Sequence, residues 1–358
     1  MNVTKSKEEG FIGEKKTWFD EQAYNAKLCG ELTINAREKH DYYYGSYSSF
    51  YIHEEMLKDK NRTLTYMKAI EHNKEDFKDK IVLDIGSGTC ILSMFAVRAG
   101  AKHVYAVENA EIALFAKEIV KRNGMEDKIT ILKGKMEEVV LPVDKVDIII
   151  SEWMGYFLLY ESMMDCVLWA RDHYLVEGGK ILPDKCQIYV SGIEDSEYKS
   201  QKIDFWKNVY GFNMDCLGNA AMKEPIVDSV NSEPIISDAC KILDIDLTKM
   251  SLEDTEFSNE YVLTFKEEEK CHAILAWFDC EFSRLTRPKT LSTSPHAGYT
   301  HWKQVVFYLE QDIQMERGDK LTGSIACKKS PQNFRELDIK ISFHHKPADG
   351  HEGVNFVQ

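Results

Sequence analysis

Long apolar runs and paired cysteine motifs are both missing from this sequence of 358 residues. Without a run of roughly eighteen apolar residues, the sequence predicts no membrane-spanning helix. The nine cysteines are scattered and none forms a C-x-x-C motif, which argues against a disulfide framework and against a metal site. The first residues also lack the apolar core of a secretory signal. We therefore expect a soluble, reduced, intracellular protein.

Basic residues are fewer than acidic residues in this sequence. Lysine and arginine number 45 against 59 aspartate and glutamate residues, which gives a formal net charge of −14. An acidic surface repels phosphate backbones, so this charge argues against direct nucleic-acid binding. Basic peptide segments are the partners that it favours.

The pattern of apolar residues changes twice along the chain. Residues 1–41 are rich in Lys and Glu and predict a mobile leader and the start of an N-terminal helix. Over residues 42–183, helical spacing alternates with short buried strands, which is typical of a Rossmann-like parallel sheet. The predicted helices cover 53–70, 90–100 and 112–124. The predicted strands cover 80–88 (a strand and its turn), 103–109, 129–134 and 146–152.

Residues 184–358 predict a second, antiparallel domain. Five segments there alternate apolar and polar residues with turn residues between them, and no helix intervenes, which favours an antiparallel β-barrel. These segments are 262–265, 271–282, 303–310, 321–328 and 337–343. A helix-prone insert at about 195–222 is rich in aromatic and charged residues.

A strand-to-helix turn, VLDIGSGTC, carries Gly86 and Gly88. Ligands with a nucleoside bind at such turns, but Ile91 occupies the third glycine position of the dinucleotide fingerprint and disfavours a pyrophosphate. Asp84 suits a cationic ligand, and Glu108 can accept hydrogen bonds from a ribose diol. S-adenosylmethionine fits all of these requirements. Taken singly, each residue also fits a turn glycine or a surface acid.

The apolar run IIISEWMGYFLLYESMM contains only two charges, Glu152 and Glu161. A buried carboxylate without a partner costs several kcal/mol, so each needs a cation or hydrogen-bond donors. An arginine guanidinium offers a planar fork that carboxylates bind bidentately. Exposure to solvent, or pairing with distant residues, is the alternative.

Together, VLDIGSGTC, SEWMGYFLLYE, YYGSY and THW resemble the type I protein arginine N-methyltransferases, over about residues 41–343. The resemblance implies a Rossmann-like methyltransferase domain, a β-barrel and a dimerisation arm at about 195–222. It implies a homodimer in nucleus and cytoplasm. Such an enzyme uses S-adenosylmethionine to methylate Arg/Gly-rich proteins and histone tails, and it forms monomethyl and then asymmetric dimethylarginine with S-adenosylhomocysteine as the other product.

The same resemblance assigns roles to individual side chains. Glu152 and Glu161 would grip the guanidinium, with His301 and its partner Asp59 beside them. The residues assigned to the cofactor are His53, Arg62 (methionine carboxylate), Asp84, Gly86, Gly88, Glu108 (ribose), Glu137 (adenine amino group) and Tyr47. The residues assigned to the substrate side are Tyr43, Tyr47, Met56, Met163 and Trp302.

Two positions depart from the family pattern. Cys90 stands where a third glycine is usual, and it is either a side chain that disturbs the cofactor loop or a tolerated small residue. Tyr44 and Gly45 replace a common Phe and Asp, which leaves the order of the N-terminal helix open. Three rival functions are a methyltransferase for small guanidino or amine metabolites, a silent partner subunit and a dehydrogenase. The second domain argues against the metabolite methyltransferase. The intact acidic pair argues against the silent subunit, and Ile91 argues against the dehydrogenase.

Overall fold

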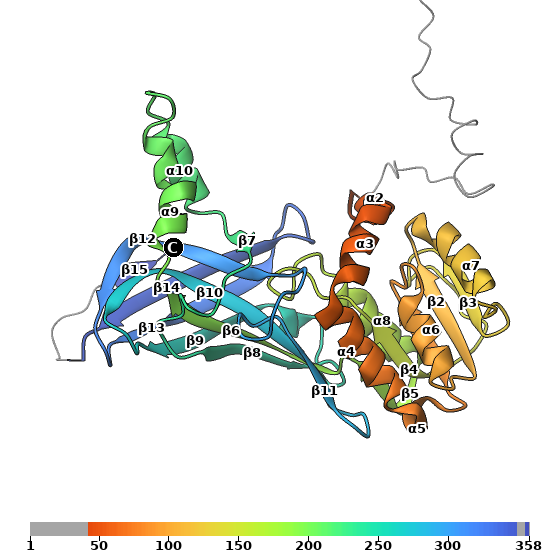
Figure 1. Cartoon of the computed structure of the whole chain (residues 1–358). Helices are drawn as coiled ribbons and strands as arrows, with labels where there is room; N and C mark the ends of the chain where they lie inside the picture. The colour runs from red at the N-terminus through yellow and green to blue at the C-terminus, as the bar shows by residue number, and fades with distance from the viewer. Residues whose placement is uncertain (1–41, 349–354, 358) are drawn as a thin grey trace, which may run out of the picture.

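A five-stranded parallel sheet forms the N-terminal half of the computed structural model, which describes residues 42–348 and 355–357 (Figure 1). The predicted leader at 1–41 lies outside the described residues. The strand order is β3-β2-β1-β4-β5, so the order reverses between β1 and β4. The strands are β1 (Ile81–Ile85), β2 (His103–Glu108), β3 (Ile129–Lys133), β4 (Val146–Ser151) and β5 (Leu175–Leu182).

Helices pack against this parallel sheet (Figure 1). They are α6 (Ile91–Arg98), α7 (Ile112–Arg122) and α8 (Met164–Tyr174), preceded by α2 (Tyr42–Ser46), α3 (Phe50–Lys58), α4 (Lys60–Glu71) and α5 (Lys74–Phe77). β1 and β4 are mostly apolar because both faces of the sheet are buried there, which is why these two strands could be recognised in the sequence.

The single helix predicted over 53–70 is wrong, because the structure has two helices that meet at Asp59. The backbone of Asp59 is extended, with φ −66° and ψ 98°, and its carboxylate accepts a hydrogen bond from the Arg62 amide at 3.0 Å. An aspartate at this position satisfies a free N–H at the start of the next helix. The helix break therefore places a carboxylate where α3 and α4 meet.

Antiparallel sheets form the second half, which confirms the predicted fold class. The six-stranded sheet has the order β7-β12-β10-β6-β8 with β11 on β10, and the four-stranded sheet has the order β15-β14-β13-β9. The strands are β6 (Lys185–Ile193), β7 (Ile226–Asp228), β8 (Cys240–Asp246), β9 (Phe257–Thr264), β10 (Glu269–Phe282), β11 (Lys289–Ser292), β12 (Gln304–Met315), β13 (Lys320–Lys329), β14 (Leu337–Lys346) and β15 (Asn355–Val357), with a 3₁₀ turn η2 (Glu253–Thr255).

The two halves share one continuous hydrophobic core. Tyr66 of α4 and Phe282 of β10 meet there edge to face, with their ring centroids 5.0 Å apart. Such packing holds the N-terminal helices against the barrel.

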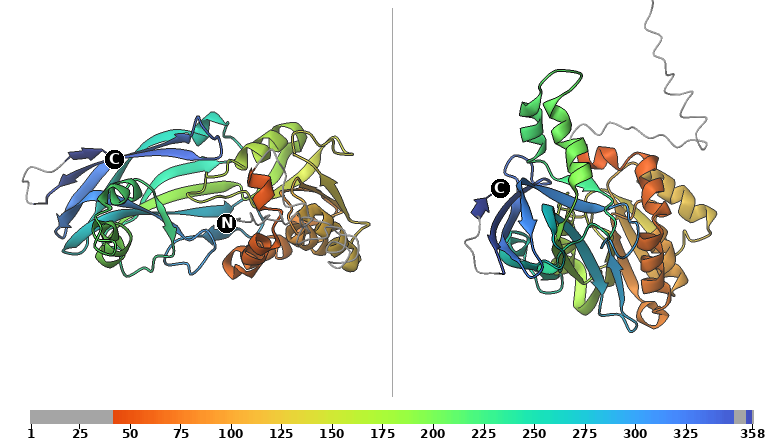
Figure 2. Two further views of the ribbon diagram at one scale, coloured as in Figure 1. Left: turned by 90° about the horizontal axis from the view of Figure 1, so that it is seen from above. Right: turned by 60° about the vertical axis from the view of Figure 1, so that its left-hand side comes forward.

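A helical arm projects from the barrel between β6 and β7 (Figures 1 and 2). It consists of α9 (Ser196–Lys202), η1 (Asp204–Lys207) and α10 (Asp215–Ala221). Its outer part exposes aromatic side chains: Tyr210 is 96% exposed and Phe212 is 68% exposed. Among the described residues, no helix is both long and apolar enough to cross a membrane.

Candidate active site

One pocket lies at the carboxyl ends of β1, β2 and β4, beneath α2 and α3. It opens where the strand order reverses, which is where open parallel sheets bind ligands. Most of the residues assigned from the sequence line it: Tyr43, Tyr47, His53, Met56, Arg62, Gly86, Gly88, Glu108, Glu152, Glu161, Met163, His301 and Trp302.

The glycine loop forms the floor of the pocket. Gly86 has φ +68°, and a Cβ there would lie 2.1 Å from the Met163 Cε atom. Gly88 has φ +53°, and a Cβ there would lie 3.2 Å from the His53 ring. Both positions favour glycine because of this positive φ, and at Gly88 the His53 ring also leaves little room for a side chain. His53 in turn donates from Nε2 to the Tyr47 carbonyl at 2.8 Å, and burial lowers its pKa.

Glu108 ends β2 with its carboxylate at the loop. Its Oε2 accepts from the Gly88 amide at 2.8 Å and its Oε1 accepts from the Ala110 amide at 2.7 Å. Each carboxylate oxygen can accept more than one hydrogen bond, so a ribose diol can still be held here. A carboxylate with apolar walls fits an uncharged ribose and a cationic sulfonium better than a phosphate.

Two predicted cofactor residues do not face the pocket. Asp84 is fully buried beneath α6, where its Oδ2 accepts from the Ser93 hydroxyl at 2.5 Å, and burial raises its pKa to about 7. Asp84 thus lies outside the pocket lining, and its assignment to the cofactor stays a prediction. Glu137 is exposed and lies outside the pocket lining, beside the thiol of Cys166, which does line it. Its assignment to the adenine amino group stays a prediction.

Cys90 is also turned away from the pocket. It is fully buried, and burial raises the pKa of its thiol to about 12, so the thiol is protonated and unreactive at neutral pH. Its backbone has φ +63°, a conformation that favours glycine. Of the two interpretations left open by the sequence, the structure favours the tolerated small residue, at a cost in backbone strain.

Glu152 finds its partner within the chain. Its Oε2 accepts from Arg62 Nε at 2.9 Å, and both side chains are 8% exposed. Arg62 Nη1 donates to the Met56 carbonyl at 3.2 Å. Arg62 is the residue predicted to hold the methionine carboxylate, so this contact links the predicted cofactor site directly to Glu152 of the acidic pair.

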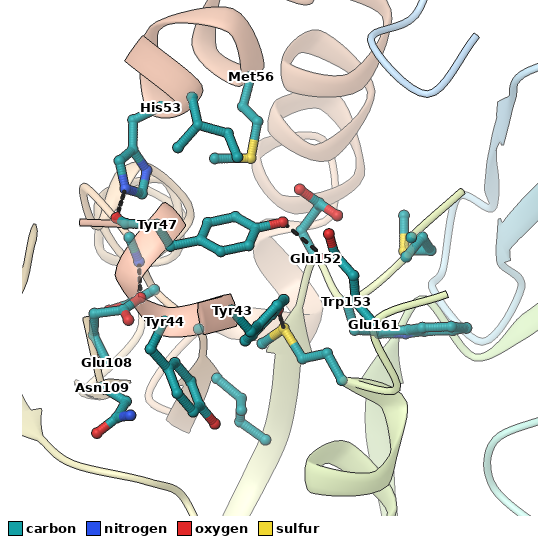
Figure 3. A pocket seen from close by; sticks show the side chains of 18 of the residues that line it. Tyr43, Tyr44, Tyr47, His53, Met56, Glu108, Asn109, Glu152, Trp153 and Glu161 are labelled. Carbon is teal, nitrogen blue, oxygen red and sulfur yellow. Dashed lines mark hydrogen bonds between the residues drawn. The ribbon is translucent and has the colours of Figure 1, made fainter. Parts of the chain in front are cut away.

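Glu161 lies beside the same end of the pocket and accepts a hydrogen bond from the Tyr47 hydroxyl at 3.0 Å (Figure 3). The pKa of Glu161 is raised to about 7, chiefly by burial; the Tyr47 hydrogen bond lowers the pKa, and the nearby Glu152 carboxylate raises it. In Figure 3, Glu108 lies on the other side of the Tyr47 ring from Glu152 and Glu161. The pocket thus has acidic groups at both ends.

His301 reaches the pocket from the loop before β12. Its Nδ1 bonds the Asp59 Oδ2 atom at 2.8 Å, and its amide donates to the same oxygen at 2.8 Å. Burial opposes ionisation of Asp59, but these bonds and the Arg62 amide outweigh it and lower the pKa of the carboxyl. Asp59 therefore stays ionised and orients the imidazole, as the predicted pair requires.

The remaining substrate-side residues form the walls. Tyr43 donates from its hydroxyl to Met163 Sδ at 3.4 Å, and Trp302 donates from Nε1 to the Met154 carbonyl at 2.7 Å. Met56 lies on α3 above the acidic pair (Figure 3). These contacts fix aromatic and thioether side chains in the walls of the pocket.

Sequence reasoning did not identify Arg335, which lines the pocket from the turn between β13 and β14. Its Nη1 donates to the Glu161 carbonyl at 2.8 Å, although the two residues are 174 positions apart. No local pattern marks an arginine in a polar turn as a pocket residue. Trp153 and Tyr156 also line the pocket; they belong to the motif SEWMGYFLLYE, but the sequence assigned no role to them.

Family models match both halves of the chain. Residues 184–349 match the arginine methyltransferase oligomerization subdomain, and residues 61–163 match ribosomal protein L11 methyltransferase. Among curated relatives, protein arginine N-methyltransferase 1 of Schizosaccharomyces pombe is 52% identical over 325 residues, which cover 91% of this chain and 95% of the relative. The Saccharomyces cerevisiae protein of the same name is 51% identical over 308 residues, which cover 86% and 88%.

Solved structures agree with this. The Trypanosoma brucei PRMT1 enzyme-prozyme heterotetrameric complex with AdoHcy matches with a TM-score of 0.84 and 40% identity, covering 87% of this chain and 98% of that one. Protein arginine methyltransferase 10 of Arabidopsis thaliana matches with a TM-score of 0.81 and 31% identity, covering 88% and 99%.

Proposed function

The chain belongs to the protein arginine N-methyltransferase family, and from this premise we propose that it is a type I enzyme acting on arginines in Arg/Gly-rich proteins and histone tails. The methyl donor is S-adenosylmethionine, and S-adenosylhomocysteine is released. The arginine products are monomethylarginine and then asymmetric dimethylarginine.

One observation carries the proposal: a single pocket has Glu152 and Glu161 at one end and Gly86, Gly88 and Glu108 at the other. The cofactor supplies an electrophilic methyl group on a sulfonium. With the cofactor at one end and the guanidinium at the other, a guanidino nitrogen can approach the methyl group in line, and such a displacement depends chiefly on positioning and electrostatics.

The acidic pair performs the positioning. Arg62 fixes Glu152 through its Nε group, and Tyr47 fixes Glu161 through its hydroxyl, so both carboxylates are held in place before the substrate arrives. A protonated guanidinium is a poor nucleophile because its charge is delocalised over three nitrogens. Two carboxylates draw that charge toward the nitrogens they contact, which leaves the attacked nitrogen richer in electrons.

One proton leaves the guanidinium in each transfer. Two groups in the structure can receive it. Glu161 has a pKa raised by burial to about 7, near the range in which a general base is efficient. The imidazole of His301, oriented by the ionised Asp59, is the other.

The product of a defined peptide tests the proposal. The chain is incubated with methyl-labelled S-adenosylmethionine and an Arg/Gly-rich peptide, and the modified arginines are fragmented in a mass spectrometer. We expect monomethylarginine followed by asymmetric dimethylarginine. Symmetric dimethylarginine would contradict the type I assignment. Methylation of free arginine without the peptide would favour a small-molecule enzyme, and absence of turnover would favour a silent partner subunit.

The chain carries an oligomerization subdomain, and we propose that its assembly is a homodimer formed through the arm. The support is the exposure of Tyr210 and Phe212, because apolar side chains gathered on a projecting element commonly mark an interface.

The net charge of −14 favours encounter with basic tails and disfavours direct binding of nucleic acid. We also propose residence in nucleus and cytoplasm, which imaging of a tagged chain can test.

A further inference from the structure

The turn between β13 and β14 reaches across to the pocket and contacts the segment that covers it. The guanidinium carbon of Arg335 lies 4.1 Å from the ring centroid of Tyr43 and 5.2 Å from that of Tyr44. Both tyrosines belong to α2, the short helix over the pocket. A guanidinium over an aromatic face is attracted by the ring, most strongly where water is excluded. The barrel thereby holds α2 through one side chain.

The same turn holds the backbone at Glu161, one member of the acidic pair. Arg335 Nη1 donates to the Glu161 carbonyl at 2.8 Å, and the Glu161 amide donates to the Arg335 carbonyl at 2.8 Å. The Ser162 hydroxyl donates to the Phe334 carbonyl at 2.6 Å. Glu161 and Ser162 have φ +75° and +55°, which is uncommon for residues with a side chain. Such a conformation persists only where its surroundings impose it.

We propose that Arg335 is a positioning residue that clasps α2 over the cofactor pocket and at the same time fixes the backbone that aims Glu161. The identity of the ligands rests on the proposed function. Because one guanidinium serves both segments, retention of the cofactor and orientation of the carboxylate depend on the same contact. Tyr47 strengthens the link, since its ring packs on Tyr43 with a centroid distance of 4.9 Å while its hydroxyl binds Glu161.

The main test substitutes Arg335→Met, which keeps an apolar stem but removes the charge and the hydrogen-bond donors. Arg335→Lys restores the charge without the planar fork. The matched control is Arg317→Met, at an exposed arginine of the barrel that lies 3.6 Å from Glu267 and away from the pocket. Three quantities are measured: the affinity for S-adenosylhomocysteine, the kcat and KM for an Arg/Gly-rich peptide, and hydrogen exchange of residues 42–49.

For Arg335→Met we expect at least tenfold weaker binding of S-adenosylhomocysteine, at least tenfold lower kcat, and faster hydrogen exchange in residues 42–49. Arg335→Lys should recover part of the affinity but little of the kcat, because an ammonium can sit over the rings but cannot reproduce the planar fork at the Glu161 carbonyl. Arg317→Met should match the native chain. Binding and kcat of Arg335→Met within twofold of the native values would overturn the proposal.

Tyr44 provides a second route if Arg335→Met does not fold. Tyr44→Leu removes the ring under the guanidinium, whereas Tyr44→Phe keeps it. A loss of affinity at least threefold greater in Tyr44→Leu than in Tyr44→Phe supports the clasp, and equal losses overturn it. If the native chain binds S-adenosylhomocysteine and the variants bind it equally well, the clasp alone is refuted. A native chain that neither binds it nor methylates the peptide refutes the proposed function instead.

Discussion

The hydrogen bond between Tyr47 and Glu161 should set the pH at which the enzyme begins to capture its peptide. Glu161 must be ionised to hold a guanidinium, and burial raises its pKa to about 7 despite the lowering effect of the Tyr47 hydroxyl. As the pH falls through 7, the carboxyl takes up a proton and loses its charge. The native chain should therefore lose kcat/KM for the peptide below pH 7.

Tyr47→Phe removes the hydroxyl and keeps the ring. A hydrogen bond to a charged group contributes roughly 1.5–3 kcal/mol. At 1.36 kcal/mol for each pKa unit, its loss should raise the pKa of Glu161 by about one to two units. At pH 7 the ionised fraction then falls by roughly five- to fiftyfold, and kcat/KM falls with it. Raising the pH above 9 should restore most of the loss.

The measurement is a profile of kcat/KM against pH for the native chain, for Tyr47→Phe and for Tyr156→Phe as the control. Tyr156 is another tyrosine at the pocket, but its hydroxyl does not hydrogen-bond to Glu161. The kcat profile should be flatter, because a bound guanidinium keeps Glu161 ionised. An acid limb at the same pH in all three proteins would refute this reasoning.

Three further predictions follow from the buried groups and the arm. Cys90→Gly should change the affinity for S-adenosylhomocysteine by less than twofold in calorimetry, since the thiol is buried away from the pocket. Protonated Asp84 contributes stability that is present below pH 4 and is lost as the pH rises through 7. The free energy of unfolding of Asp84→Asn, measured in urea, should therefore rise relative to that of the native chain by up to roughly 4 kcal/mol between pH 4 and pH 8. Deletion of about 197–218 should give a folded monomer with little activity in sedimentation and methylation assays, and a fully active monomer would contradict the role of the arm.

The sequence revealed those parts of the fold whose burial is uniform. β1 and β4 are continuous apolar runs because both faces of the sheet are covered. β5 was not recognised, because Glu177 and Gly178 interrupt it with exposed positions. The break at Asp59 was not recognised either, since the apolar spacing continues through it; the structure shows that Asp59 both caps α4 and binds His301, which is distant in sequence.

The candidate site divides in a similar way. Residues in local motifs, such as Gly86 and Glu152, could be assigned because the motif carries them to the pocket. The direction in which a side chain leaves a strand could not be predicted from the sequence. Asp84 turns beneath α6, whereas its neighbour Ile85 lines the pocket. Arg335 could not be found at all, because its position depends on how the barrel packs against α2.

The most direct test of the arginine-methylation mechanism compares turnover of an Arg/Gly-rich peptide by Glu152→Gln, Glu161→Gln and the native chain. Both variants keep the shape of the side chain and remove its charge. We expect turnover to fall by about tenfold to a hundredfold or more, since the transition state needs both charges. Affinity for S-adenosylhomocysteine should hold in Glu161→Gln but weaken in Glu152→Gln, where Arg62 loses its partner. Near-native turnover in both variants would contradict the mechanism.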